Sequence, residues 1–166
     1  MNVNTLSPLL ATVVLFAGAR PAAAQHPSRY NCEKLMTDAE IQSATGLSHE
    51  ALIVQKFGSD NGEPAESTSC RYSGNSSTIS VGFTVATGSA VPLYSAAVFS
   101  GPAGGREKLA GIGDEAVYIA QGHAGGARTH GVIIVVRFQA ARPDAWTGFD
   151  VKAAATKILK QLVGRV

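Results

Sequence analysis

The sequence predicts a single α+β domain: a five-stranded, mainly antiparallel sheet packed by a short N-terminal helix and a longer C-terminal helix, with one disulfide. Three observations predict this class. The 166 residues make a chain of one-domain length. Several short segments alternate apolar and polar residues, as strands do. Two further segments have the caps and apolar stripe of helices.

The first 24 residues are expected to be a signal peptide. The apolar run Leu9–Ala19 is shorter than the ~20 residues that a membrane-spanning helix needs. The small residues Ala22–Ala24 have the pattern of a cleavage site, which would make Gln25 the mature start. We therefore expect residues 25–166 to form one periplasmic or secreted domain. No cysteine stands at the cleavage point and no later segment is long and apolar enough to span a bilayer, so we expect no membrane anchor.

The charge of the chain argues against one class of partner. Its 14 Lys and Arg against 12 Asp and Glu leave a formal net charge of +2, which loss of Arg20 with the signal peptide would lower by one. Proteins bind phosphate backbones through clustered Lys and Arg. We therefore expect neither nucleic acid nor anionic lipid as a partner.

Segment 31–46 joins a cysteine to a helix whose two ends are marked. Thr37 and Glu40 have the spacing of a capping box, and Gly46 supplies the left-handed residue that ends a helix. A helix this short is marginal alone. Because cysteines in exported chains usually pair, we expect a Cys32–Cys70 disulfide to join the helix to a later strand. The alternatives are a reactive thiol or a metal-binding pair, and the absence of Cys-x-x-Cys and of nearby histidines disfavours the metal.

Five strands are expected, at 51–57, 69–72, 78–86, 116–120 and 132–138. In the clearest one, 78–86, apolar residues alternate with small or polar ones. The apolar set is Ile79, Val81, Phe83 and Val85, and the other set is Ser80, Gly82 and Thr84. Segment 132–138 is apolar on both faces apart from Arg137, which predicts a central strand covered on both sides. A polar turn and a glycine-rich loop over 121–130 make two hairpins of the last four strands.

Two further helices are expected, a short one at 91–100 and the longest one at 148–163. The longest has Thr147 and Asp150 at capping-box spacing. It also has an apolar stripe, formed by Ala154, Ala155, Ile158, Leu159, Leu162 and Val163. The polar stretch Gly58–Thr68 is expected to be an exposed loop.

Three short motifs follow one another along the chain. Cys-Glu-Lys-Leu-Met-Thr-Asp-Ala-Glu-Ile begins at Cys32, Cys-Arg-Tyr begins at Cys70, and Gly-Ile-Gly-Asp-Glu-Ala spans Gly111–Ala116. In this order they resemble a large group of small exported bacterial proteins and lipoproteins, mostly of unknown function, over about Asn31–Phe138. The resemblance implies an antiparallel sheet with packed helices, similar to the α/β sandwich of the photosystem oxygen-evolving subunit family. It implies no catalytic residue, and the chain lacks the lipid-anchor cysteine of many members.

Four polar residues are weak candidates for a site. Asp114 and Glu115 could bind a cation or act as a general base, although we favour a structural role in which Asp114 caps a turn. His123 and His130 flank the glycine-rich loop and, with Asp114, could ligate a metal. Their spacing matches no common ligand pattern, and the chain has no phosphate-loop motif and no Gly-x-Ser-x-Gly elbow. We therefore expect no metal, no cofactor and no catalytic residue.

These observations favour a non-catalytic exported binding or accessory protein, whose protein or small-molecule ligand the sequence does not identify. One alternative is a small hydrolase or metal-dependent enzyme that uses Asp114, His123 and His130. Another is an inhibitor or immunity-type module that binds a protein through a surface around Trp146 or the loop 58–68. Trp146 is the aromatic residue that we expect to stay partly exposed as a contact.

Overall fold

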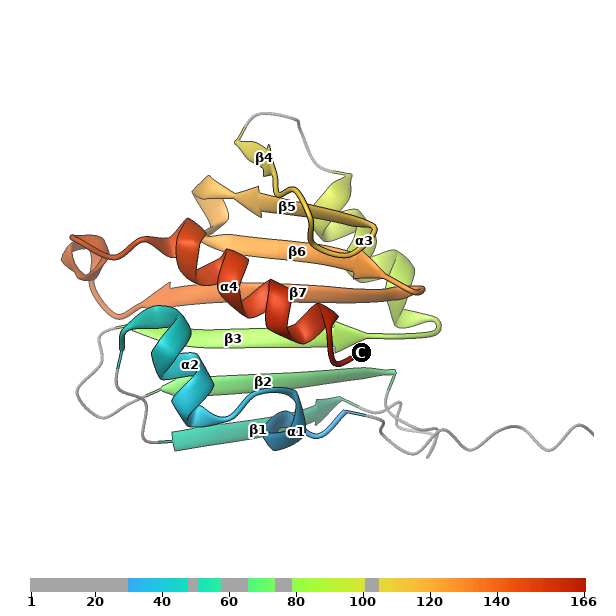
Figure 1. The fold of residues 1–166 in the computed structure, drawn as a ribbon, viewed down its shortest axis with the longest axis horizontal. Coiled ribbons are helices and arrows are strands. Elements are labelled where there is room, and N and C mark those ends of the chain that lie inside the picture. The colour runs from blue at the N-terminus through green and yellow to red at the C-terminus, as the bar shows by residue number, and fades with distance from the viewer. Residues whose placement is uncertain (1–29, 48–50, 58–65, 74–78, 101–104) are drawn as a thin grey trace, which may run out of the picture.

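The computed structural model describes residues 30–47, 51–57, 66–73, 79–100 and 105–166. The expected signal peptide and residues 58–65 of the expected loop lie outside the described residues. Within them the fold is α+β, as expected, and its centre is an open antiparallel sheet of seven strands in the order β1-β2-β3-β7-β6-β5-β4 (Figure 1). The strands are β1 (Ala51–Phe57), β2 (Ser67–Ser73), β3 (Ile79–Ala86), β4 (Arg106–Lys108), β5 (Glu115–Ile119), β6 (Ala124–Thr129) and β7 (Val132–Ala140).

The expectation of five strands is wrong, since it lacks β4 and β6. Strand β4 has three residues, too few to show an alternation. Strand β6 reads Ala-Gly-Gly-Ala-Arg-Thr, and its glycines stand where branched or aromatic residues would mark a strand, so it is expected as part of a loop. The prediction of a central strand is confirmed, because β7 lies in the middle of the sheet, between β3 and β6.

Helices lie on both faces of the sheet. In Figure 1, α1, α2 and α4 lie in front of it and α3 lies behind. They are α1 (Cys32–Leu35), α2 (Asp38–Thr45), α3 (Ala90–Phe99) and α4 (Val151–Val163), with two 3₁₀ turns, η1 (Ala120–Gly122) and η2 (Pro143–Trp146). None of the described helices is long and apolar enough to cross a membrane.

Helix α2 has both of its predicted ends. The Thr37 hydroxyl accepts from the Glu40 N–H at 3.3 Å, and the Glu40 carboxylate accepts from the Thr37 N–H at 2.8 Å, which completes the capping box. Gly46 follows in the left-handed conformation, with φ of 73°.

Helix α4 begins at Val151, three residues later than expected. Asp150 is itself the N-cap, and its side chain accepts from the Ala153 N–H at 2.9 Å. Thr147 is instead the C-cap of η2, where its N–H donates to the Asp144 carbonyl at 3.1 Å. The capping-box spacing of Thr147 and Asp150 is therefore coincidental, and that prediction is wrong.

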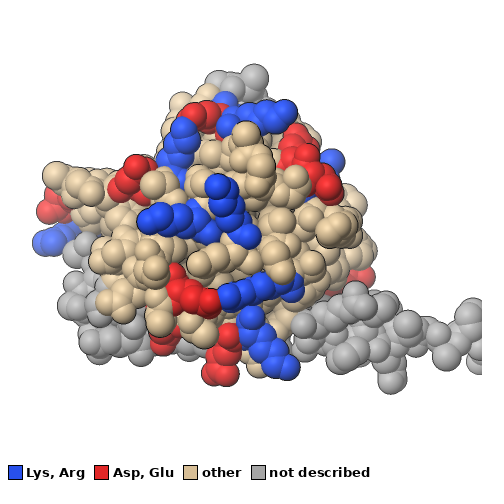
Figure 2. All heavy atoms as spheres, viewed as in Figure 1, with Lys and Arg blue, Asp and Glu red and all other residues tan. Residues whose placement is uncertain are grey.

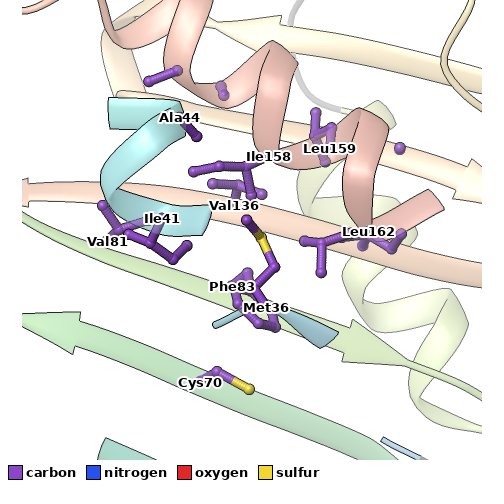
Figure 3. Packing of buried hydrophobic residues seen from close by; sticks show 14 of the residues in the cluster. Met36, Ile41, Ala44, Cys70, Val81, Phe83, Val136, Ile158, Leu159 and Leu162 are labelled. Atoms are coloured by element: carbon purple, nitrogen blue, oxygen red, sulfur yellow. The ribbon is translucent and has the colours of Figure 1, made fainter. Parts of the chain in front are cut away.

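The main core lies between the front face of the sheet and helices α2 and α4 (Figure 3). Helix α2 contributes Ile41 and Ala44, both buried. The apolar stripe of α4 and alternate residues of β3 and β7 meet them. Side chains that come together in Figure 3 include Val81, Phe83, Val136, Ile158, Leu159 and Leu162. Full burial of one large apolar side chain contributes ~1.5–3 kcal/mol, so this layer supplies much of the stability.

The predicted disulfide is present and joins α1 to β2. The Cα atoms of Cys32 and Cys70 lie 5.7 Å apart. Beside the disulfide, the fully buried Tyr72 of β2 donates a hydrogen bond to the Met36 carbonyl oxygen at 2.7 Å. Burial raises the pKa of Tyr72, so its hydroxyl stays protonated and keeps donating. A covalent bond and a buried hydrogen bond thus hold the same segment.

An ion pair joins the C-terminus to these helices. Arg165, which follows α4, donates to both carboxylate oxygens of Glu40 and to the Leu35 carbonyl. The Arg165 guanidinium, followed by the Thr37 N–H, lowers the pKa of Glu40 from 4.5 to about 2. Glu40 therefore caps α2 and binds the end of α4 at once.

Two consecutive glycines of β6 let one helix approach each face of the sheet. A Cβ at Gly125 would lie 3.0 Å from Leu159 Cδ1 of α4, and a Cβ at Gly126 would overlap the Val98 side chain of α3. Successive residues of a strand face opposite sides, so α4 and α3 cover opposite faces of β6. Close packing of the two helices thus requires glycine, which has no side chain, at these two positions.

We predict that Glu40→Gln lowers the free energy of unfolding at pH 7 by about 1 kcal/mol, the size of a helix cap or a partly exposed ion pair. Because folding lowers the pKa of Glu40, its carboxylate stabilises the fold fully above pH 4.5 and loses this effect as the pH falls toward 2. Urea denaturation of wild type and variant should show a difference that shrinks over this window. The stability difference between wild type and Arg165→Gln should shrink over the same pH range. A difference that does not change with pH would contradict the assignment of this effect to the Glu40 carboxylate.

We predict that Gly126→Ala destabilises the protein by about 1–3 kcal/mol, because the added methyl group overpacks the contact with Val98. Thermal or urea unfolding measures the loss. Gly122→Ala is the matched control, since its Cβ would meet the nearest atom at an ordinary 3.6 Å. Adding Val98→Ala should recover part of the stability of the Gly126 variant. If the double variant instead loses the sum of the two single-variant stability losses, the added methyl group does not clash with Val98.

Candidate functional site

Asp114 and His130 lie close together, but through the backbone of a turn. The Asp114 carboxylate accepts from the His130 N–H at 3.1 Å, and the Asp114 N–H donates to the Arg128 carbonyl at 2.8 Å. His130 and Gly131 form the tight turn between β6 and β7, with φ of 47° and 76°. Asp114 therefore holds this turn in place, which is a structural role, but at the turn between β6 and β7 and not at the turn of its own segment Gly111–Gly113.

The other two polar candidates lie elsewhere. Glu115 pairs with Arg128 at 3.8 Å on the exposed surface. His123 and His130 stand at opposite ends of β6, about 20 Å apart along an extended strand. Among the described residues, no group of three or more His, Cys, Asp or Glu side chains could hold a metal ion. The structure thus keeps His123 away from Asp114 and His130, so the three residues of the enzyme hypothesis do not converge.

Trp146 lies half-buried on η2 and stacks on His123. Their ring centroids are 4.0 Å apart and their planes differ by 16°. His123 has φ of 43°, which is uncommon outside glycine, and its Nδ1 is buried without a hydrogen-bond partner in the described part of the chain. The Phe149 ring also lies near Trp146, with 6.4 Å between the ring centroids. Trp146 therefore closes one end of the sheet while part of its surface stays accessible.

A groove of about 300 Å³ lies on the sheet face that carries α3, beyond the part that α3 covers. Strands β2, β3 and β7 form its floor, and Tyr94 of α3 stands at its side. Its polar lining consists of Ser69, Arg71, Ser80, Thr84, Arg137 and Gln139. This volume lies at the lower end of the range for small-molecule sites. Figure 2 shows the opposite face, over α2 and α4, where Lys, Arg, Asp and Glu are interspersed.

Three residues form a row across the floor of the groove. Arg71 of β2 pairs with Gly82 of β3, which pairs in turn with Arg137 of β7. Residues paired across strands share a face, and strands lie ~4.8 Å apart, so the Cα atoms of the two arginines are about 10 Å apart. Both arginines line the groove, one on each side of Gly82.

Gly82 leaves a hollow where a side chain would fit. The atoms nearest to a Cβ built there are backbone oxygens, that of Cys70 at 3.6 Å and that of Arg137 at 4.0 Å. Both distances are ordinary van der Waals contacts, and the backbone has no positive φ. Packing therefore does not require glycine at this position, unlike at Gly126.

Hydrogen bonds hold one arginine of the row and not the other. Arg71 Nη2 donates to the Ser80 hydroxyl at 3.2 Å, and that hydroxyl lies 3.4 Å from the Gln139 carbonyl oxygen. Among the described residues, the Arg137 guanidinium has no such partner and neither arginine is ion-paired. The groove thus presents donors that the described protein does not use.

A second, more open hollow of about 570 Å³ continues from the groove. The two share Arg71, Ser80 and Gln139, and Trp146 bounds the second one at the strand ends. The described lining of both contains guanidinium, hydroxyl and amide groups and no carboxylate or histidine. Such a surface donates hydrogen bonds, and its described residues offer no general base for nucleophilic catalysis.

Sequence reasoning did not select the groove residues, although two signals for them were present. Ser80, Gly82 and Thr84 form the non-apolar half of the alternation in β3. Arg137 is the single charged residue in a largely apolar strand. Neither signal shows that these strands are neighbours, and the pairing of β3 with β7 is what joins them into one surface.

Comparison with family models, with curated protein sequences and with solved structures found no match to the chain. The resemblance to small exported bacterial proteins stays a prediction. The candidate site rests on the geometry of the groove.

Proposed function

We propose that this protein is an exported, non-catalytic binding protein that holds a small-molecule ligand in the groove on β2, β3 and β7. The observation that carries the proposal is the hollow at Gly82, which lies between two long polar side chains in a position where a larger residue would fit. Strands favour branched and aromatic residues, and glycine weakens them. Neither packing nor backbone conformation requires glycine at this place in the sheet. Close approach of a ligand is therefore the best explanation for it.

The environment of the groove supports this function. Tyr94 of α3 provides an aromatic wall, and the opposite side offers Ser80 and Gln139. Small-molecule sites commonly combine apolar walls with a few placed polar groups. The Cys32–Cys70 disulfide supports the exported location, since disulfides persist in oxidising compartments.

We predict that Gly82→Val fills the hollow, leaves the protein folded and weakens ligand binding at least tenfold. The added Cβ would meet its nearest atom at 3.6 Å, and valine suits a strand, so the melting temperature should not fall. Ligand-detected NMR with a fragment library of neutral, cationic and anionic compounds measures binding to both proteins. Gly122→Ala, on the turn η1 outside the groove, is the control that should bind like wild type.

Two outcomes would contradict the proposed function. One is that no fragment of any charge class binds the wild-type protein. The other is that the fragments bind wild type and the folded Gly82→Val variant equally, since their site would then lie outside the groove.

A further inference from the structure

We propose further that the ligand is an organic anion, a carboxylate or a phosphate ester, whose charged group lies between Arg71 and Arg137 above Gly82. The inference rests on the proposed binding function and adds the chemical class of the ligand. It is argued from three features of the groove: its unpaired charge, the arrangement of its donors and its apolar wall.

The charge of the two arginines is uncompensated among the described residues. A third arginine on the same sheet face, Arg128, serves the fold: it donates to the Ser95 hydroxyl at 2.6 Å, lies 5.1 Å from the centroid of the Phe99 ring and pairs with Glu115. Arg71 and Arg137 take part in none of the ion pairs found among the described residues. Within the described part of the chain, no carboxylate therefore neutralises either guanidinium group.

No described residue of the groove supplies the missing negative charge. The lining of both connected hollows contains no Asp or Glu. Two like charges on one face, one strand apart from each other on either side of Gly82, repel each other, and an anion between them offsets that repulsion through two attractions. The positive charge of the described groove residues thus favours anionic over neutral and cationic ligands.

The donors are arranged for a carboxylate or a phosphate. A guanidinium group presents parallel N–H donors that match two oxygens of such an anion. The row Arg71–Gly82–Arg137 puts one guanidinium on each side of an open position, at a Cα separation of about 10 Å. Ser80 holds the Arg71 guanidinium, which reduces the freedom that this side chain loses on binding.

The wall of the groove indicates what the anion is attached to. Tyr94 and Val135 line the groove on the α3 side of the arginine row, where the half-buried Tyr94 offers its aromatic ring and Val135 is itself buried. A ligand with an apolar or aromatic body can therefore bury that body against α3 while its charged end reaches the arginines. Inorganic phosphate, which lacks this body, should bind more weakly than its phenyl ester.

The test uses phenyl phosphate and phenylacetate as anionic probes, with 2-phenylethanol and phenethylamine as their neutral and cationic counterparts. Amide shifts of the protein, followed by two-dimensional NMR, report where and how tightly each binds. We expect the anions to shift the signals of Gly82 and Arg137 and to bind at least tenfold more tightly than the other two, with affinity that falls as salt is raised. Preference for phenyl phosphate assigns a phosphate ester, and preference for phenylacetate assigns a carboxylate.

Variants separate a specific site from general charge. Arg137→Gln should weaken binding of the preferred anion at least tenfold, and Arg137→Lys, which keeps the charge and loses the fork, should fall between that variant and wild type. Lys157→Gln removes one charge from the exposed side of α4, on the other sheet face, and should change affinity less than twofold. Thermal unfolding shows that each variant is folded, and Arg71→Gln repeats the test on the other arginine.

Four results would overturn the inference. Groove binding of 2-phenylethanol as tight as that of the anions would reject the anionic class and leave the binding function standing. Equal losses of anion affinity in Arg137→Gln and Lys157→Gln would show that binding depends only on the overall charge of the protein. Failure of both anions to bind, while fragments of another class still bind in the groove, would reject the class alone. Failure of every class in the fragment screen would remove the binding function as well.

Discussion

The alternation of side chains along the paired strands β3 and β7 is the constraint on which the rest of the structure depends. One face of this pair is apolar along its length and forms the main core with α2 and α4. The other face changes character midway. Ala86, Ile133 and Val135 are apolar and buried on the α3 side, whereas Gly82 and Arg137 lie farther along the same face, outside that cover. This one change decides where α3 packs and where the groove begins.

Strand β6 makes the two-sided cover possible. Helices on both faces of one strand need side chains small enough for close approach, and Gly125 and Gly126 provide this on successive residues. Arg128 of the same strand then holds α3 through Ser95 and Phe99. The strand with the least strand-like composition is therefore the one on which two layers of the fold depend.

The N-terminal segment is held by interactions of different kinds that converge on a few residues. The Cys32–Cys70 disulfide and the Tyr72 hydrogen bond join it to β2, and Arg165 joins it to the end of α4 through Glu40. Because these contacts bind two short helices that would not persist alone, they keep the front of the sheet covered. The front face is thereby committed to the core, whereas the α3 face carries the groove on β2, β3 and β7.

By itself the sequence determined the features that depend on neighbours along the chain. These are the capping box of Thr37 and Glu40, the end of α2 at Gly46, the apolar stripe of α4 and the alternation in β3. It also identified β7 as central from its apolar composition. It did not reveal β6, because close packing against two helices overrides the low strand propensity of glycine.

Only the tertiary structure decided which residues form a site. Asp114, His123 and His130 are near one another in the sequence, and the extended β6 holds the two histidines at its opposite ends. Arg71 and Arg137 are far apart in the sequence, and they flank one hollow because β3 pairs with β2 on one side and with β7 on the other. Strand pairing is a long-range choice set by the whole core, and for this reason no local pattern in the chain could show it.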